Sequence, residues 1–77
     1  MHKAYHVLLD VKGLMCPMPI LKAKKVLKGL TTGEILKVQA TDPASEADFK
    51  AFTQQTKDQL LEIEIIDGVF NFLIQKG

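Results

Sequence analysis

The dipeptide Asp67-Gly68 is the feature that most constrains how this chain can fold. It lies between two apolar runs, residues 60–66 and residues 69–75, each of which has the length of a strand. A two-residue hairpin turn needs a positive φ angle at both turn positions, which Gly adopts freely and Asp tolerates. We therefore predict that the chain ends in two antiparallel strands.

Two further strands are predicted upstream of this hairpin. The apolar run at residues 5–11 indicates the first strand of the chain. Residues 34–40 alternate between apolar and polar side chains, which is the two-residue period of a strand with one buried face. The buried face of this second strand would carry Leu36, Val38 and Ala40.

Two helices are predicted between these strands. Residues 17–30 have helical spacing, and their buried stripe would consist of Ile20, Ala23, Val26, Leu27 and Leu30. Asp42-Pro43 then supplies an acceptor side chain and a proline where a helix would begin, which predicts a second helix over residues 45–57. The side chains of this helix that should face the core are Phe49, Phe52 and Thr56.

The order strand, helix, strand, helix, strand, strand predicts an α+β fold. In so short a chain it favours a two-layer sandwich, βαβαββ, with two helices on one face of a four-stranded mixed sheet. The 77 residues suffice for one domain, which we assign to residues 1–77. Beyond the last hairpin, the pattern leaves the strand order open.

Composition indicates a cytoplasmic protein. The single cysteine excludes an internal disulfide, and hydrophobic residues make up 47% of the chain without forming a run as long as a membrane span. Near the N-terminus, Asp10 and Lys12 interrupt the apolar residues before they could form an export signal. We therefore expect no membrane association.

The net charge of +1 conceals an uneven distribution of charge. Residues 1–38 carry seven Lys against Asp10 and Glu34, whereas residues 39–77 carry three Lys against seven acids. The lysines that follow the cysteine would attract an acidic partner, although an ordinary solvated helix face explains them equally well. These candidate partner-binding residues are Lys22, Lys24, Lys25 and Lys28.

Cys16 is the only plausible nucleophile, and it begins the segment Cys16-Pro17-Met18-Pro19. If Cys16 caps the following helix, Pro17 occupies the first helical position and Pro19 removes the third N–H group. The nearest donor to the sulfur would then be the Met18 N–H. A helix N-terminus beside lysines should lower the pKa of the thiol. The alternative is a strand-to-helix corner with a small buried thiol.

The other polar residues near Cys16 have simpler interpretations. Asp10 should accept hydrogen bonds from the N–H groups of Lys12 and Gly13 in the preceding turn. His2 and His6 are the only imidazoles, and the sequence places no third ligand beside them. We therefore predict neither a metal site nor a cofactor.

The whole pattern resembles the TusA/SirA family of small sulfur-carrier proteins. The likeness rests on Leu9-Asp10-x-x-Gly13-Leu14-x-Cys16-Pro17-x-Pro19 before a Lys-rich helix, on Asp42-Pro43-Ala44 with Asp48, and on the closing Asp67-Gly68 hairpin. It implies a sandwich like the C-terminal domain of translation initiation factor three. It also implies that Cys16 accepts sulfane sulfur as a persulfide, in a site shaped by Pro17, Met18, Pro19, Asp10 and Gly13.

The resemblance further implies partners. A cysteine desulfurase or another persulfide donor would load Cys16, and a downstream acceptor protein would take the sulfur for tRNA thiolation, molybdenum cofactor assembly or sulfur metabolism. Where many members carry Cys or His in or after the second helix, residues 52–59 carry neither, so a resolving thiol or a base would come from a partner. Met18 between the prolines, where tRNA-thiolation members often have Glu, makes the rim apolar.

Two other classes of function stay open. The chain could be a regulatory protein-interaction module in which Cys16 is dispensable. Nucleic-acid binding ranks last, because all ten basic residues are Lys and bidentate recognition by Arg is absent. We therefore expect no direct sequence-specific contact with nucleic acid.

Overall fold

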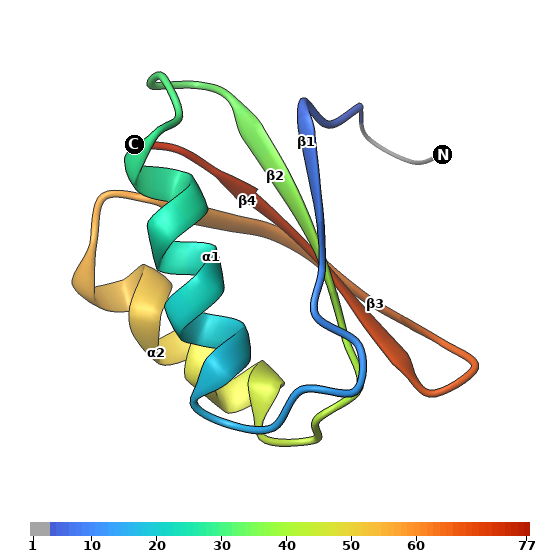
Figure 1. The fold of residues 1–77 in the computed structure, drawn as a ribbon. Coiled ribbons are helices and arrows are strands. Elements are labelled where there is room, and N and C mark those ends of the chain that lie inside the picture. Colours follow the sequence, from blue (N-terminus) through green and yellow to red (C-terminus); the bar gives the residue numbers. More distant parts are fainter. Residues whose placement is uncertain (1–3) are drawn as a thin grey trace.

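The computed structural model describes residues 4–77 and has the predicted two-layer α+β sandwich. The strands are β1 (Val7–Asp10), β2 (Ile35–Ala40), β3 (Gln59–Ile66) and β4 (Val69–Gln75), and the helices are α1 (Met18–Lys28) and α2 (Ser45–Gln55). The order βαβαββ is therefore confirmed (Figure 1).

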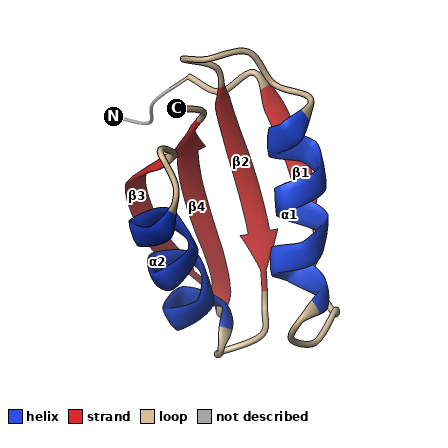
Figure 2. Ribbon diagram, turned by 90° about the vertical axis from the view of Figure 1, so that its left-hand side faces the viewer, coloured by secondary structure: helices blue, strands red, loops and turns tan. Residues whose placement is uncertain are grey.

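The sheet is mixed, with the strand order β1-β2-β4-β3 that the sequence left open. β1 is parallel to β2, and the other two pairs are antiparallel. Both helices cover the same face, α1 over β2 and α2 over β3 (Figure 2). The closing hairpin turns at Asp67 and Gly68, whose φ angles are 50° and 78° as the turn requires.

Several predicted boundaries are wrong by one or two residues. β1 is shorter than residues 5–11, although the His6 N–H still donates to Ile35 O at 2.8 Å. α1 ends at Lys28 because the Gly29 N–H donates to Val26 O, which tightens the last turn. α2 ends at Gln55 because Thr56 is extended.

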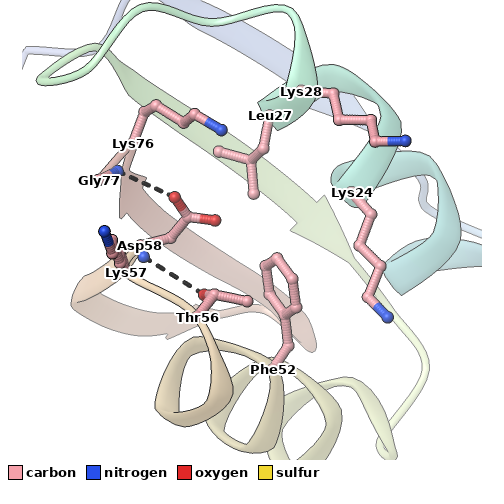
Figure 3. A pocket seen from close by; sticks show the side chains of 9 residues that line it. All are labelled: Lys24, Leu27, Lys28, Phe52, Thr56, Lys57, Asp58, Lys76 and Gly77. Atoms are coloured by element: carbon pink, nitrogen blue, oxygen red, sulfur yellow. Dashed lines mark hydrogen bonds between the residues drawn. The ribbon is translucent and has the colours of Figure 1, made fainter.

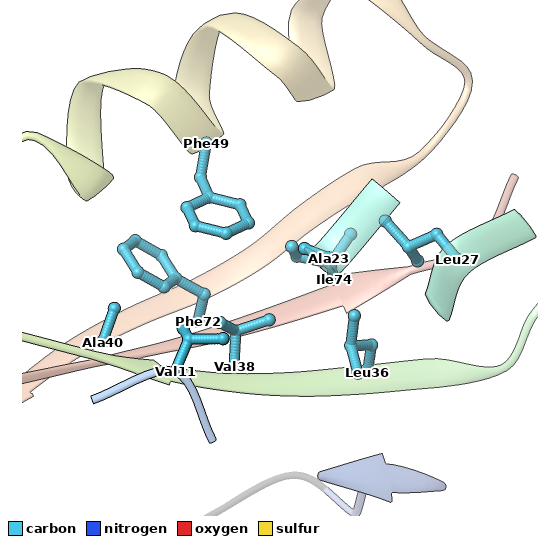
Figure 4. Close-up of a cluster of buried hydrophobic side chains, with 9 residues drawn as sticks. All are labelled: Val11, Ala23, Leu27, Leu36, Val38, Ala40, Phe49, Phe72 and Ile74. Atoms are coloured by element: carbon cyan, nitrogen blue, oxygen red, sulfur yellow. The ribbon is translucent and has the colours of Figure 1, made fainter. Parts of the chain in front are cut away.

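The core lies between the sheet and the helices (Figure 4). The predicted inner face of β2 is fully buried, and its Val38 lies opposite Phe72 of β4. Phe49 of α2 stacks on Phe72 with ring centres 4.6 Å apart. The α1 stripe packs as predicted, with Ala23 and Leu27 buried and Ile20, Val26 and Leu30 half-buried. Thr56 is exposed, so its predicted place in the core is wrong.

Within the described part of the chain, neither helix combines the length and the apolar character needed to cross a membrane.

Candidate functional site

Cys16 is exposed on the loop between β1 and α1, and it is not the helix cap that we expected. Pro17 takes the cap position and α1 begins at Met18, so Pro19 occupies the second helical position instead of the third. The Met18 N–H donates to Met15 O at 2.9 Å in a turn of the loop. This backbone bond replaces the predicted bond from the Met18 N–H to the sulfur.

Two carboxylates from the far half of the chain hold Cys16 in place. The Cys16 N–H donates to Asp42 Oδ2 at 2.6 Å, and the Cys16 Sγ–H donates to Asp48 Oδ2 at 3.1 Å. Asp42 lies just before α2 and also accepts the Ala44 N–H through Oδ1 at 3.1 Å. The beginning of α2 therefore fixes both the backbone and the sulfur of Cys16.

These carboxylates also reverse the expected electrostatics of the thiol. The hydrogen bond to Asp48 raises the pKa of Cys16 above its ordinary value, and partial desolvation and the charges of Asp48 and Asp42 raise it further. The expectation of a lowered pKa is therefore wrong. Its cause lies in the fold, which brings acids 26 and 32 residues distant to the cysteine.

The turn before Cys16 is fastened by two side-chain oxygens. Asp10 Oδ1 accepts the Lys12 N–H at 3.0 Å, which confirms half of the prediction for Asp10. The Gly13 N–H donates instead to Thr41 Oγ1 at 2.9 Å, so the other half is wrong. Because Thr41 is the neighbour of Asp42, the loop before Cys16 and the segment before α2 are joined at two adjacent residues.

Apolar side chains lie open on the loop and on the first turns of α1. The predicted apolar rim residue, Met18, is exposed, and so is Leu21 one turn later. Met15 is 68% exposed, which is unusual for a large apolar residue beside a candidate site. Exposed apolar side chains of this kind suit contact with another protein.

A groove of about 230 Å³ runs from Cys16 between the two helices. Its α1 side includes Ile20 and Lys24, and its α2 side includes Asp48 and Phe52. Of the four lysines predicted to bind a partner, Lys24 lines this groove and Lys28 lines a hollow farther along the helices. Lys22 and Lys25 are exposed and line neither hollow.

His6 is the imidazole that the structure describes. His6 Nδ1 accepts the Ile35 N–H at 2.9 Å and so fastens the residue before β1 to β2. His2 lies outside the described residues. Among residues 4–77, His, Cys, Asp and Glu side chains form no group of three that could hold a metal ion.

Comparison with known proteins identifies the family of this chain. The model of the family described as Sulfurtransferase TusA matches residues 7–76. This chain belongs to that family. It is 52% identical to the sulfur carrier protein TusA of Allochromatium vinosum over 90% of this chain and 91% of that protein. It is 49% identical to a putative sulfur carrier protein of Neisseria meningitidis, over 87% of this chain and 90% of the relative.

A solved structure has the same fold as this TusA-family chain. The SirA-like protein of Desulfitobacterium hafniense superimposes with a TM-score of 0.84 at 27% identity, covering 94% of this chain and 99% of that one. The family resemblance noted in the sequence is thereby confirmed in both its TusA and its SirA parts.

Sequence reasoning missed the roles of three residues in this site. The sequence indicates Asp42 only as part of a helix start. It predicts no contact of Thr41 or Asp48 with the loop that carries Cys16. Asp42-Pro43 before a helix was the available signal, since an acid there accepts backbone N–H groups. Nothing local to the sequence indicates that one of those N–H groups belongs to Cys16.

Proposed function

We propose that this chain is a sulfur carrier that accepts sulfane sulfur as a persulfide on Cys16 and passes it to a downstream protein. The observation that carries the proposal is the position of Cys16, an exposed thiol at the open end of an interhelical groove in a TusA-family chain. The relatives named as sulfur carriers match nearly the whole chain, which extends the support beyond a short motif.

The proposed transfer requires no oxidant or reductant. The Cys16 sulfur attacks the outer sulfur of a persulfide on the donor protein, and the bond between the two donor sulfurs breaks. The donor cysteine leaves as a thiolate and takes up the proton that Cys16 has lost. The products are a Cys16 persulfide and a donor thiol, so sulfur and protons balance.

Asp48 would act before this transfer by keeping Cys16 protonated. Its carboxylate accepts the Sγ–H bond, which disfavours the thiolate while no partner is bound. A cationic group of a docked donor that paired with Asp48 would remove this effect and release the nucleophile. The carrier would then be more reactive toward its partners than toward small electrophiles.

The proposal implies protein partners at both steps and a reducing compartment. A cysteine desulfurase is the proposed donor, and the acceptor is a protein of tRNA thiolation, molybdenum cofactor assembly or sulfur metabolism. We place the carrier in the cytoplasm, where a single free thiol is kept reduced. The exposed apolar residues Met15, Met18 and Leu21 offer a contact surface beside Cys16 for both partners.

Intact-mass measurement tests the proposal. The protein is incubated with a cysteine desulfurase and free cysteine, and half of the sample is then treated with a reductant. We expect a gain of one sulfur atom that the reductant removes and that Cys16→Ser does not acquire. A chain that gains no sulfur, or a Cys16→Ser variant that still gains it, would refute the proposal.

A further inference from the structure

Beyond the groove that begins at Cys16 lies a second hollow of about 360 Å³, whose lining residues are drawn in Figure 3. Lys24 and Phe52 line both hollows, and the Lys24 ammonium lies 5.4 Å from the centre of the Phe52 ring. Because the hollows share these two walls, they adjoin each other along the helices, and we treat them as the two ends of one groove. We call the far hollow the lysine end and the near one the Cys16 end.

The lysine end is strongly basic. Four lysines from three parts of the chain line it, together with apolar side chains that include Leu27 and Phe52; the lysines are Lys24, Lys28, Lys57 and Lys76. The one carboxylate side chain among its lining residues is Asp58, which is buried and accepts the Gly77 N–H at 2.9 Å. The lining therefore has an excess of positive charge.

These lysines are available to a ligand. In the part of the chain that the structure describes, the ion pairs given by the geometry join Lys12 to Asp10 and Lys50 to Glu46. Neither pair uses a lysine of the groove. An anionic ligand would consequently have no internal carboxylate to displace from these ammonium groups.

The Cys16 end lacks this excess of positive charge. Asp48 and Lys24 both line it, and Asp42 lies directly behind the Cys16 backbone, whose N–H it accepts. An elongated ligand in this groove would therefore meet carboxylates at the cysteine and ammonium groups at the other end. Such polarity selects both the charge pattern and the direction of a ligand.

The length of the groove sets the spacing of that pattern. α1 rises by about 1.5 Å per residue, so the helix from Met18 to Lys28 is roughly 15 Å long. An extended peptide advances by about 3.3 Å per residue and covers this length in four to five residues. A compact small molecule would occupy one end of the groove only.

We propose that the groove binds the cysteine-bearing segment of a partner protein in an extended form. The partner's cysteine lies at Cys16, no acid follows it immediately, and carboxylates four to five residues away contact the lysine end. This inference rests on the proposed function, since it describes how a donor or acceptor would dock on the carrier. It adds Lys57 and Lys76 to the docking surface and removes Lys22 and Lys25.

Three synthetic peptides test the spacing. The first is Cys-Gly-Ser-Gly-Glu-Glu, the second moves both Glu residues next to Cys, and the third replaces them by Lys at the distant positions. Each is supplied as its mixed disulfide with glutathione. Cys16 attacks the peptide sulfur, the disulfide breaks and glutathione leaves as a thiol, so the equilibrium yield of the protein–peptide disulfide reports binding in the groove.

We expect the first peptide to give a yield about three to ten times that of either other peptide, the effect of one or two exposed ion pairs. Lys28→Glu and Lys57→Glu should each reduce this preference. Lys25→Glu is the matched control, because it makes the same charge change on α1 outside the groove. High salt should remove the preference in the unmodified chain.

Three results would overturn the inference. Equal yields for the two acidic peptides would mean that the lysines attract acidic peptides by a general electrostatic field, whatever the position of the Glu residues. An equal effect of Lys25→Glu and Lys28→Glu would mean that the groove is not the binding place. A dimer that forms through this face and is lost in Lys28→Glu would assign the groove to a second copy of the chain.

Failure of this inference is distinguishable from failure of the proposed function. The peptide experiment involves no sulfane sulfur, and the intact-mass experiment involves no peptide. A chain that acquires sulfur on Cys16 but shows no peptide preference retains its function and loses the docking model. A chain with the preference but no sulfur gain retains the groove and loses the carrier function.

Discussion

The two ends of the interhelical groove are built in the same way but differ in charge, because lysines dominate one lining while one lysine and one aspartate line the other. At the Cys16 end, Asp42 is 7% exposed and accepts the N–H groups of Cys16 and Ala44. At the lysine end, Asp58 is 9% exposed and accepts the Gly77 N–H. Each buried carboxylate joins segments that are distant along the chain. The exposed charged side chains around them differ between the two ends.

Acidic residues have two different roles in this small protein. Asp42 and Asp58 satisfy backbone donors, so they determine where the loops run. Asp48 instead contacts the exposed sulfur, so it determines the protonation of the candidate site. Substitutions of the first kind should change the free energy of unfolding, and substitutions of the second kind should change reactivity.

Phe49→Ala should have the largest effect, because it removes the support that both ends share. The ring is fully buried in α2 against Phe72. Removing it should reduce the free energy of unfolding by about 3–5 kcal/mol, measured by urea denaturation. The matched variant Phe52→Ala removes a half-buried ring of the same helix and should lose less. A larger loss for Phe52→Ala would show that α2 is held mainly along the groove.

Asp42→Asn should have the next largest effect and should act at the Cys16 end. An amide offers one oxygen where the carboxylate offers two, so either the Cys16 or the Ala44 N–H loses its acceptor. We expect the free energy of unfolding to fall by about 1–3 kcal/mol in urea denaturation.

Asp58→Asn is the counterpart of Asp42→Asn at the lysine end. It should cost less stability, because the amide oxygen can still accept the single Gly77 N–H bond. It should also leave the alkylation rate of Cys16 unchanged, whereas Asp42→Asn should alter it. Equal effects of the two variants on alkylation would contradict a local action of Asp42.

The sequence predicted the elements of the fold better than the contacts of the site. Local patterns sufficed for the Asp67-Gly68 hairpin, the alternation in β2 and the stripe of α1, because each depends on residues close in the chain. The Cys16 contacts depend on residues 26 and 32 positions away, which periodicity does not pair. The sequence did not predict Lys57 and Lys76 as groove residues for the same reason. Only the packing of the helices and the end of β4 brings them near Lys24 and Lys28.

Asp48→Asn should change reactivity more than stability. Without the carboxylate the pKa of Cys16 falls, and the pH profile of its alkylation shifts to lower pH. For each unit of that fall the thiolate fraction at neutral pH rises about tenfold while its intrinsic reactivity falls about threefold, a net gain of roughly threefold.

Glu46→Gln is the matched control for Asp48→Asn. Glu46 lies on the same first turn of α2 but pairs with Lys50, and its replacement should leave the alkylation rate of Cys16 unchanged. An unchanged rate in Asp48→Asn would mean that the hydrogen bond from sulfur to carboxylate does not hold the thiol protonated.

The smallest expected effect concerns a turn at the lysine end. Glu34 accepts the Thr31 N–H through Oε1 at 2.7 Å, and its backbone carbonyl accepts the Lys76 N–H at 2.8 Å. The bond from Thr31 lowers the pKa of Glu34. Its stabilising contribution is therefore complete above the pKa of the unfolded chain and disappears as the pH falls through the lower pKa of the folded chain.

Thermal unfolding of Glu34→Gln at two pH values checks this sign. Near pH 7 the variant should melt about 1–2 °C below the unmodified chain, and the two should converge once the pH has fallen below the lowered pKa of Glu34 in the folded chain, because protonated Glu34 resembles Gln. A gap that widened in acid would mean that Glu34 is destabilising when charged. The Glu34 backbone carbonyl alone would then hold Lys76 at this turn. The buried carboxylates of Asp42 and Asp58 would be enough to position the loops at the two ends of the groove.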